Sequence, residues 1–380
     1  MRLETSRLSA HGRPAKLLGS LAVALLVAAP GFADPRPRIY LNLEERIPPS
    51  EPSVVWRQPL TTYAAALLFS PDGKRIALRR DRTVTYLDAF NGETLAERIV
   101  SPLETFTRAI AISGDGRLAV TTGQSLDLYG PDSAEPAERT PCPKCRIAAI
   151  AFSPDGASIA SQNSRAYSES DIGGLRVLQL RTGQVAELAA ADGRPVVSFS
   201  RDGRRLLATH VSHVGRESGR GFRVWDTSDW KLLQTVTLPG DTMGTVATGA
   251  IEGADFVAVY GNDNEIEMRD LVNDLVLWSA PLLPHQFAAP SSPVYGLTLQ
   301  LAAVAPNGEF IVSYERPDAS DFAQNMGGLV VRRTLDGRIL AVYAVPAVVS
   351  LGIAPDSNTF AYATSSQVRG MHVGLLRVPR

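Results

Sequence analysis

Three histidines provide the side chains in this sequence best suited to bind a metal ion. His210 and His213 stand three residues apart in "HVSH", and His285 lies further along in "LLPHQF". Imidazole nitrogens combined with a carboxylate, such as that of Glu217 or Asp321, are ligands that zinc accepts. The spacing is not a zinc signature in itself, and ordinary surface histidines are the alternative. We therefore assign no metal and no cofactor, and keep the three histidines as candidate ligands.

The two cysteines, Cys142 and Cys145, form a C-x-x-C pair in "CPKC". Two nearby cysteines in an exported protein usually form a disulfide, although a bridge that closes so small a loop stabilises the fold only modestly. A redox pair is expected at a helix N-terminus, and haem attachment requires a histidine where Arg146 stands. We predict a structural disulfide, with a redox pair or metal ligation as the alternatives.

A further set of side chains is suited to protein recognition. Tyrosine and arginine are common among the residues that dominate protein interfaces. Long segments between the predicted strands contain Arg165, Tyr167, Arg216, Arg220, Tyr314 and Arg316. We predict that these residues contribute to an interaction face, and solvated loop positions are the alternative.

A repeated motif predicts the elements that would position these residues. "FSPDGKRIAL" begins at Phe69, and related stretches begin at Ile112, Phe152, Phe199, Ile251, Val304 and Ile353. The equivalent aspartates Asp72, Asp115, Asp155 and Asp202 are spaced by 43, 40 and 47 residues. A repeat of roughly 40 to 50 residues is typical of a propeller blade of four strands.

The first copy shows why each repeat should form four strands. "AALLFS", "RIAL", "TVTYLD" and "TLAERIV" are short segments rich in β-branched, aromatic and aliphatic residues. They are separated by "PDGK", "RDR" and "AFNG", in which proline, aspartate, asparagine and glycine favour turns. Seven such copies predict an all-β protein, a seven-bladed β-propeller of four-stranded blades.

At this level the sequence resembles the WD40-like β-propellers, and in particular the FSPDG-type repeats of exported bacterial proteins such as the TolB-type and YVTN-like propellers. The resemblance covers Val54 to Arg380 and implies the fold, because the repeated residues make turns and blade contacts. Only Trp225 and Asp226 reproduce the Trp-Asp pair, and the Gly-His pair of eukaryotic members is missing.

The last repeat indicates how the ring closes. It provides three strands, the third within Met371–Val378, whereas a closed ring requires a fourth. "VVWRQPL", Val54–Leu60, matches "VLWSAPL", Val276–Leu282, so that Trp56 aligns with Trp278. We predict that Val54–Leu60 is the outer strand of the last blade, that residues 34–53 form a proline-rich linker, and that residues 54–380 form the propeller.

Long segments gather on one predicted face. The second turn of a blade and the connection to the next blade lie opposite the FSPDG turns. Long second turns are expected from Asn163, His210 and Glu315, and long connections from Pro136 and Leu282. Binding residues commonly lie on elaborated loops of a rigid scaffold, although neutral insertions are the alternative.

The first 33 residues predict export. Basic residues precede the uncharged stretch Leu17–Ala29, and Gly31 and Ala33 stand at the positions that a signal peptidase reads. We expect cleavage after Ala33 and a periplasmic or secreted protein without a membrane span. A formal net charge of -1 gives no indication of nucleic-acid binding.

No catalytic residues can be assigned from the sequence. It contains no G-x-S-x-G elbow, and no converging set of acids, bases or metal ligands can be placed. We therefore expect a non-enzymatic, monomeric interaction scaffold that binds a protein partner. A propeller enzyme, such as a lactonase-like hydrolase, and an electron-transfer or quinoprotein-associated protein are the alternatives.

Overall fold

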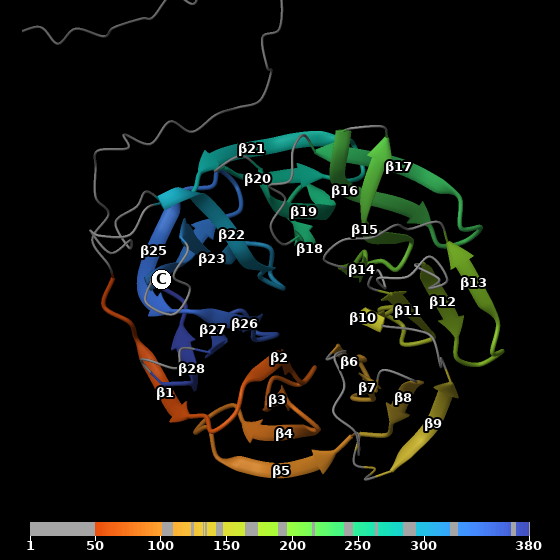
Figure 1. The fold of residues 1–380 in the computed structure, drawn as a ribbon, viewed down its shortest axis with the longest axis horizontal. Coiled ribbons are helices and arrows are strands. Elements are labelled where there is room, and N and C mark those ends of the chain that lie inside the picture. The colour runs from red at the N-terminus through yellow and green to blue at the C-terminus, as the bar shows by residue number, and fades with distance from the viewer. Residues whose placement is uncertain are drawn as a thin grey trace, which may run out of the picture. The chain divides into compact units, whose positions relative to one another are not determined.

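The computed structural model describes fourteen stretches of the chain: residues 50–100, 109–122, 125–131, 133, 135–141, 147–163, 174–188, 196–214, 217–238, 246–262, 265–283, 294–319, 326–365 and 370–379. They belong to one compact unit, Arg36–Arg380, and their regular elements are all β-strands. The strands form seven four-stranded antiparallel sheets. Figure 1 shows these sheets as blades around a common centre, which confirms the predicted seven-bladed propeller.

Six blades follow the order of the chain from the inner to the outer strand. The first comprises β2 (Ala64–Phe69), β3 (Arg75–Arg80), β4 (Thr83–Asp88) and β5 (Thr94–Ile99). The second comprises β6 (Ile110–Ile112), β7 (Leu118–Thr121), β8 (Ser125–Tyr129) and β9 (Pro136–Pro141), and the third β10 (Ile147–Phe152), β11 (Ser158–Asn163), β12 (Leu175–Gln179) and β13 (Val185–Leu188).

The fourth blade comprises β14 (Val197–Phe199), β15 (Arg205–Val214), β16 (Glu217–Asp226) and β17 (Leu232–Leu238). The fifth comprises β18 (Val246–Ile251), β19 (Ala254–Asn262), β20 (Glu265–Asp270) and β21 (Leu275–Pro281). The sixth comprises β22 (Val294–Val304), β23 (Phe310–Ala319), β24 (Met326–Arg333) and β25 (Ile339–Pro346). The turn between β18 and β19 is the degenerate repeat at Ile251, which confirms that it builds a blade.

The seventh blade combines the two ends of the propeller. Its inner strands are β26 (Val348–Ile353), β27 (Thr359–Thr364) and β28 (His372–Arg377), and its outer strand is β1 (Val54–Pro59). β1 pairs with β28 in antiparallel register, from Val54 opposite Leu376 to Pro59 opposite His372. The predicted closure by an N-terminal outer strand is therefore confirmed, and Figure 1 shows β1 beside β28.

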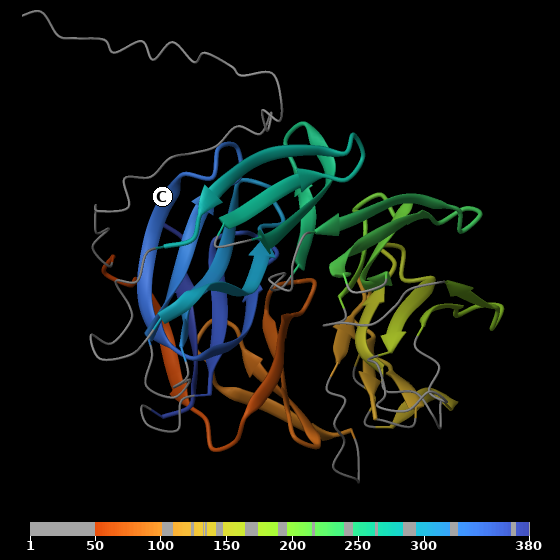
Figure 2. The ribbon, with the colours of Figure 1, turned by 45° about the horizontal axis from the view of Figure 1, so that its top comes forward.

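The core lies between the blades. Ile76 and Leu78 of β3 are completely buried, and they pack in one cluster with Ala361 and Ala363 of the neighbouring seventh blade. Alternating strand residues point to opposite faces of a sheet, so each blade can bury apolar side chains against both of its neighbours. The view in Figure 2 shows the blades tilted relative to one another around the ring.

The repeated Ser-x-Asp-Gly stretch makes a turn whose polar groups bond to each other. In the first blade, Asp72 Oδ1 accepts hydrogen bonds from Ser70 Oγ at 2.6 Å and from the Lys74 amide at 3.0 Å. The serine hydroxyl also accepts from the Arg75 amide at 2.9 Å. The Ser70 hydrogen bond and the Lys74 amide keep the pKa of Asp72 below its usual range. These aspartates are therefore engaged in fixing the turn.

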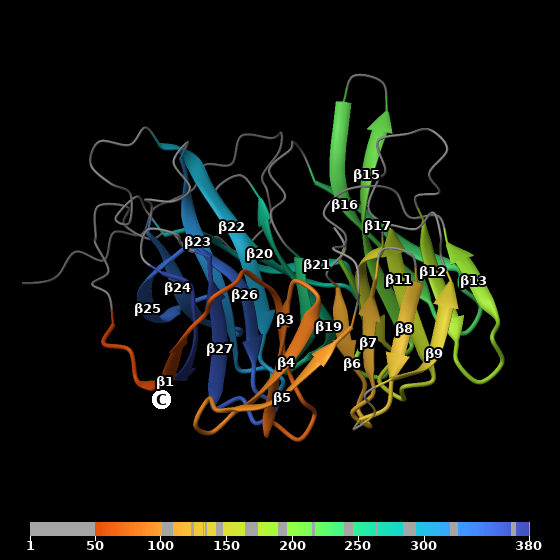
Figure 3. The same cartoon turned by 60° about the horizontal axis from the view of Figure 1, so that its bottom comes forward.

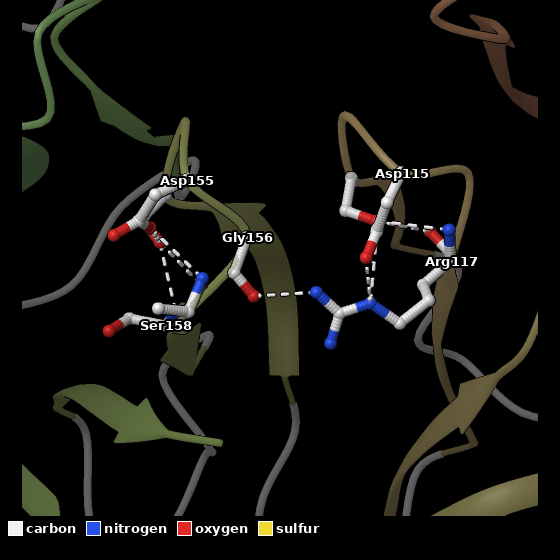
Figure 4. A network of polar contacts seen from close by, with 8 residues as sticks. Asp115, Arg117, Asp155, Gly156 and Ser158 are labelled. Carbon is white, nitrogen blue, oxygen red and sulfur yellow. Dashed lines mark hydrogen bonds and ion pairs between the residues drawn. The ribbon is translucent and has the colours of Figure 1, made fainter. Parts of the chain in front are cut away.

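Turns of neighbouring blades also contact each other. Arg117 Nη2 donates to the Gly156 carbonyl at 2.8 Å, while its Nε bonds to Asp115 (Figure 4). The Asn307 amide donates to Ser357 Oγ at 3.1 Å in the same way between the sixth and seventh blades. These contacts place the FSPDG turns side by side on one face of the ring, which we call the turn face.

Trp56 and Trp278 occupy equivalent sockets, as the sequence match predicts. Trp56 Nε1 donates to the Ala89 carbonyl at 3.0 Å, and Trp278 Nε1 donates to the Thr334 carbonyl at 2.6 Å. Each acceptor lies in the third turn of the next blade. A Cβ atom added at Gly92 or Gly337 of these turns would lie 2.8 Å from the indole ring, so only glycine allows this close approach.

Candidate functional site

Two hairpins extend the ring on the side opposite the turn face, and we call this side the long-hairpin face. β15 and β16 have 10 residues each and pair without interruption from Arg205 opposite Asp226 to Val214 opposite Glu217. β22 and β23 have 11 and 10 residues. Figure 3 shows β15 and β16 projecting beyond the strands of the neighbouring blades.

Among the described residues, no strand pairs with the outer edges of the β15–β16 hairpin near its tip. On the β15 side the last bond runs from the Thr209 amide to the Val196 carbonyl, and on the β16 side β17 pairs only as far as Leu238 opposite Arg220. Among the described residues, His213 and Val214 therefore pair only with Ser218 and Glu217. Unpaired backbone groups on an exposed edge can add a strand from another chain.

A buried ion pair lies within the sixth blade, between β23 of the other long hairpin and β24. The Arg332 guanidinium and the Glu315 carboxylate are 3.1 Å apart, and their side chains are 0% and 1% exposed. The Ser313 hydroxyl donates to Glu315 Oε1 at 2.8 Å. A charge removed from water is tolerated when its partner and its hydrogen bonds are complete, and both charges meet that condition here.

The pair also holds the connection between the fifth and sixth blades. The Leu283 amide donates to Glu315 Oε2 at 2.8 Å, and Arg332 Nη2 donates to the Pro281 carbonyl at 3.2 Å. Arg332 Nη1 donates to the Gly337 carbonyl at 3.3 Å, in the third turn of the sixth blade. The pair therefore fixes the start of this connection.

The predicted long second turns from His210 and Glu315 are wrong in part. Residues up to Val214 and Ala319 continue as strands, because their backbones pair with β16 and β22. The predicted connection from Pro136 is also shorter, since Pro136–Pro141 form the outer strand β9. Polar and glycine-containing sequence is typical of loops, but here a long neighbouring strand pairs with its backbone.

The structure places the predicted interaction residues in different environments. Tyr314 lies in β23 and is 1% exposed, packed in the core of the sixth blade. Its placement on an exposed interaction face is therefore wrong, because the alternation of β23 turns it inward. Arg316 lies partly buried in the same strand, and Arg220 lies in β16. Arg165, Tyr167 and Arg216 lie outside the described residues.

The predicted metal ligands and the disulfide remain predictions. His210 and His213 lie in β15, where their backbones pair with Gly221 and Ser218. His285, Cys142 and Cys145 lie outside the described residues. Within the described stretches, no group of three or more His, Cys, Asp or Glu side chains is arranged to hold a metal ion.

His372 at the ring closure is a buried polar residue that the sequence reasoning missed. His372 is the first residue of β28, and its side chain is almost completely buried. Its Nδ1 lies 2.9 Å from Arg57 Nη2 and 3.0 Å from Thr364 Oγ1. Burial, followed by the Arg57 charge, lowers the pKa of His372 to about 4. A neutral imidazole therefore accepts the Arg57 hydrogen bond between β1 and β28.

No described segment forms a helix that could span a membrane. No protein-family model matches the sequence, and no curated protein matches it.

Solved structures share the fold at low sequence identity. A chain of Kuenenia stuttgartiensis hydrazine synthase matches at 14% identity with a TM-score of 0.62, over 84% of this chain and 97% of that chain. The β-propeller domain of Myceliophteria thermophila Cps50 (Swd1) matches at 10% identity with a TM-score of 0.64, over 86% of this chain and 100% of that domain. At this identity the likeness shows the propeller fold alone.

Proposed function

We propose that this protein is an exported, non-enzymatic propeller of the FSPDG-repeat type that binds a protein partner through its long-hairpin face. The observation that carries the proposal is the β15–β16 hairpin, whose tip extends past both β14 and β17. A rigid ring with one elaborated side is a common arrangement for binding. The edges of this hairpin, which pair with no described strand near the tip, suit an extended segment that adds to the sheet through main-chain hydrogen bonds.

The test shortens this hairpin without disturbing the blade. Val211–Arg220 is replaced by Asn-Gly between His210 and Gly221, a dipeptide that favours a two-residue hairpin turn. His210 and Gly221 are already paired, so the remaining ladder is preserved. The melting temperature should stay within a few degrees of wild type, because within the described part of the chain the removed residues pair with each other and with the end of β17.

Partner binding is measured by affinity purification from the native host's periplasm after chemical crosslinking, followed by quantitative mass spectrometry. A protein enriched with wild type and lost with the shortened hairpin supports the proposal. As a matched control, the β14–β15 turn at Asp202–Gly203, on the turn face of the same blade, is replaced by Asn-Gly, and this variant should retain the partner. Equal recovery with all three proteins would refute the assignment of the face.

Export is tested independently. N-terminal sequencing of the mature protein should begin at Asp34, since small residues stand at Gly31 and Ala33. A soluble cytoplasmic protein that begins at Met1 would contradict export while leaving the binding face to be judged by the hairpin experiment.

A further inference from the structure

The turn face contains a groove at the sixth blade. It lies at the opposite end of the strands from the long hairpins. Its volume is about 1470 Å³. It runs past the first turns of the fifth, sixth and seventh blades and past the third turn of the sixth blade. Small-molecule sites usually measure roughly 300 to 1,000 Å³, so this groove has the size for a polypeptide segment.

The groove has a structural origin in the closure of the ring. In the fifth and seventh blades, a tryptophan follows a bulge in the outer strand and is covered by the third turn of the next blade. The residue after the corresponding bulge in β25 is Ala341. The next blade has no third turn, because its third and outer strands, β28 and β1, come from opposite ends of the chain. Among the described residues, neither a tryptophan nor a third turn therefore occupies this position between the sixth and seventh blades, where the Ser50 amide bonds to the Val342 carbonyl.

Part of the groove wall is apolar. Leu335 and Leu340, which both line it, are 74% and 43% exposed. Phe310, Tyr343 and Val378 also line it. Burying the two leucines against a ligand would remove apolar surface from water, and this provides a driving force for binding.

The charged residues of the groove are mostly acidic. Glu51, Glu252 and Glu309 line it with exposed side chains, and none forms an ion pair with another described residue. Arg333 is neutralised by its ion pair with Asp336, so that Arg377 is the remaining cation among the lining residues. Complementary charge favours a cationic ligand and rejects an anionic one.

We infer that this groove is a second docking surface, and that its occupant is a basic segment of a partner protein that carries large apolar side chains between Lys or Arg residues. The leucines receive the apolar side chains, and the three glutamates receive the cationic ones. The site is separate from the long-hairpin face, and its test does not depend on the partner proposed there.

The experiment selects ligands from a phage-displayed library of random peptides, each about twelve residues long, on the immobilised mature chain. Enriched peptides should combine Lys or Arg with Leu, Phe or Trp, and their affinities are then measured by fluorescence anisotropy. The double variant Leu335→Asp/Leu340→Asp should weaken binding by roughly tenfold or more. Because binding is partly electrostatic, Glu252→Lys/Glu309→Lys and an increase in NaCl from about 50 to about 300 mM should each weaken it severalfold.

Phe90→Asp is the matched control, because Phe90 is the residue equivalent to Leu335 in the third turn of the first blade and is 86% exposed. It should leave the affinity unchanged, and circular dichroism should show all variants folded, since the altered side chains are exposed. Absence of enrichment, enrichment of acidic peptides, or equal binding to the leucine variant would overturn the inference. A groove that binds peptides only after deletion of residues 36–47 would identify this chain's own segment as the occupant and would also overturn it.

Discussion

The buried pair Glu315–Arg332 allows a quantitative test of how the long-hairpin face is supported. Glu315→Leu leaves the Arg332 guanidinium buried without its counter-charge, and Arg332→Met leaves the Glu315 carboxylate in the same position. Breaking a buried pair on one side typically costs about 3 to 5 kcal/mol. Both side chains are at most 1% exposed, so water cannot compensate and each single variant should lose stability in this range.

The double variant Glu315→Leu/Arg332→Met should lose much less stability than the two single changes together. It removes both charges, and its main remaining penalty is the Leu283 amide, which loses its acceptor 2.8 Å away. An unsatisfied buried donor costs about 1 to 3 kcal/mol. The double-mutant cycle should therefore give a coupling energy of at least about 3 kcal/mol.

The assay is equilibrium urea unfolding followed by tryptophan fluorescence, with all variants at the same pH and salt. The control cycle uses Arg176–Glu187, an ion pair at 2.9 Å whose side chains are 32% and 66% exposed. Its coupling should stay below about 1 kcal/mol, because solvent screens the charges. A coupling at Glu315–Arg332 as small as in this control would refute the view that the pair is isolated from water.

Three further predictions concern the closure and the cysteines. The pKa of His372 is about 4 in the folded protein and 6.5 ordinarily, so the stability that its neutral form contributes is present above about pH 6.5 and is lost as the pH falls towards 4. In His372→Gln, urea unfolding should show a pH dependence of stability that is smaller by up to about 3 kcal/mol. A chain that begins at Ser50 should melt like the mature protein, whereas one that begins at Thr61 should melt far lower or aggregate. The longer truncation loses the buried Trp56, which costs about 3 to 5 kcal/mol, and exposes the edge of β28. Equal melting of the two chains in calorimetry would contradict the closure. Thiol titration of the unfolded, unreduced protein should find Cys142 and Cys145 blocked, and two free thiols would exclude the disulfide.

Turn chemistry made the blade count predictable. The turn at Asp72 is held by hydrogen bonds within six consecutive residues, so its sequence signature survives without knowledge of the rest of the fold. The closure was predictable for a related reason. Trp56 and Trp278 serve the same contact with the next blade, and this shared role produces the sequence match between the two outer strands.

The candidate site was less predictable, because it depends on partners distant in the sequence. The strand extension to Val214 exists only because Glu217 and its neighbours pair with it. Glu315 was assigned to a loop, yet it is buried because Arg332, on the adjacent strand, neutralises it. The periodicity and composition of a sequence indicate the average environment of a segment. The structure around Val214 and Glu315, in contrast, depends on a single contact with another segment.

Ring closure and the inferred groove have a common cause. A covalent turn between the third and fourth strands covers the preceding blade, as Thr334–Gly337 covers Trp278. In the seventh blade the same two strands are joined only by hydrogen bonds between β1 and β28, so no turn exists to cover the sixth blade. A propeller sealed by its own two ends thus closes its sheet edges and leaves one socket open. In this chain Ala341 stands where a tryptophan stands in the fifth and seventh blades. Leu335, Leu340 and three glutamates line the groove on that blade, and there we infer that a ligand binds.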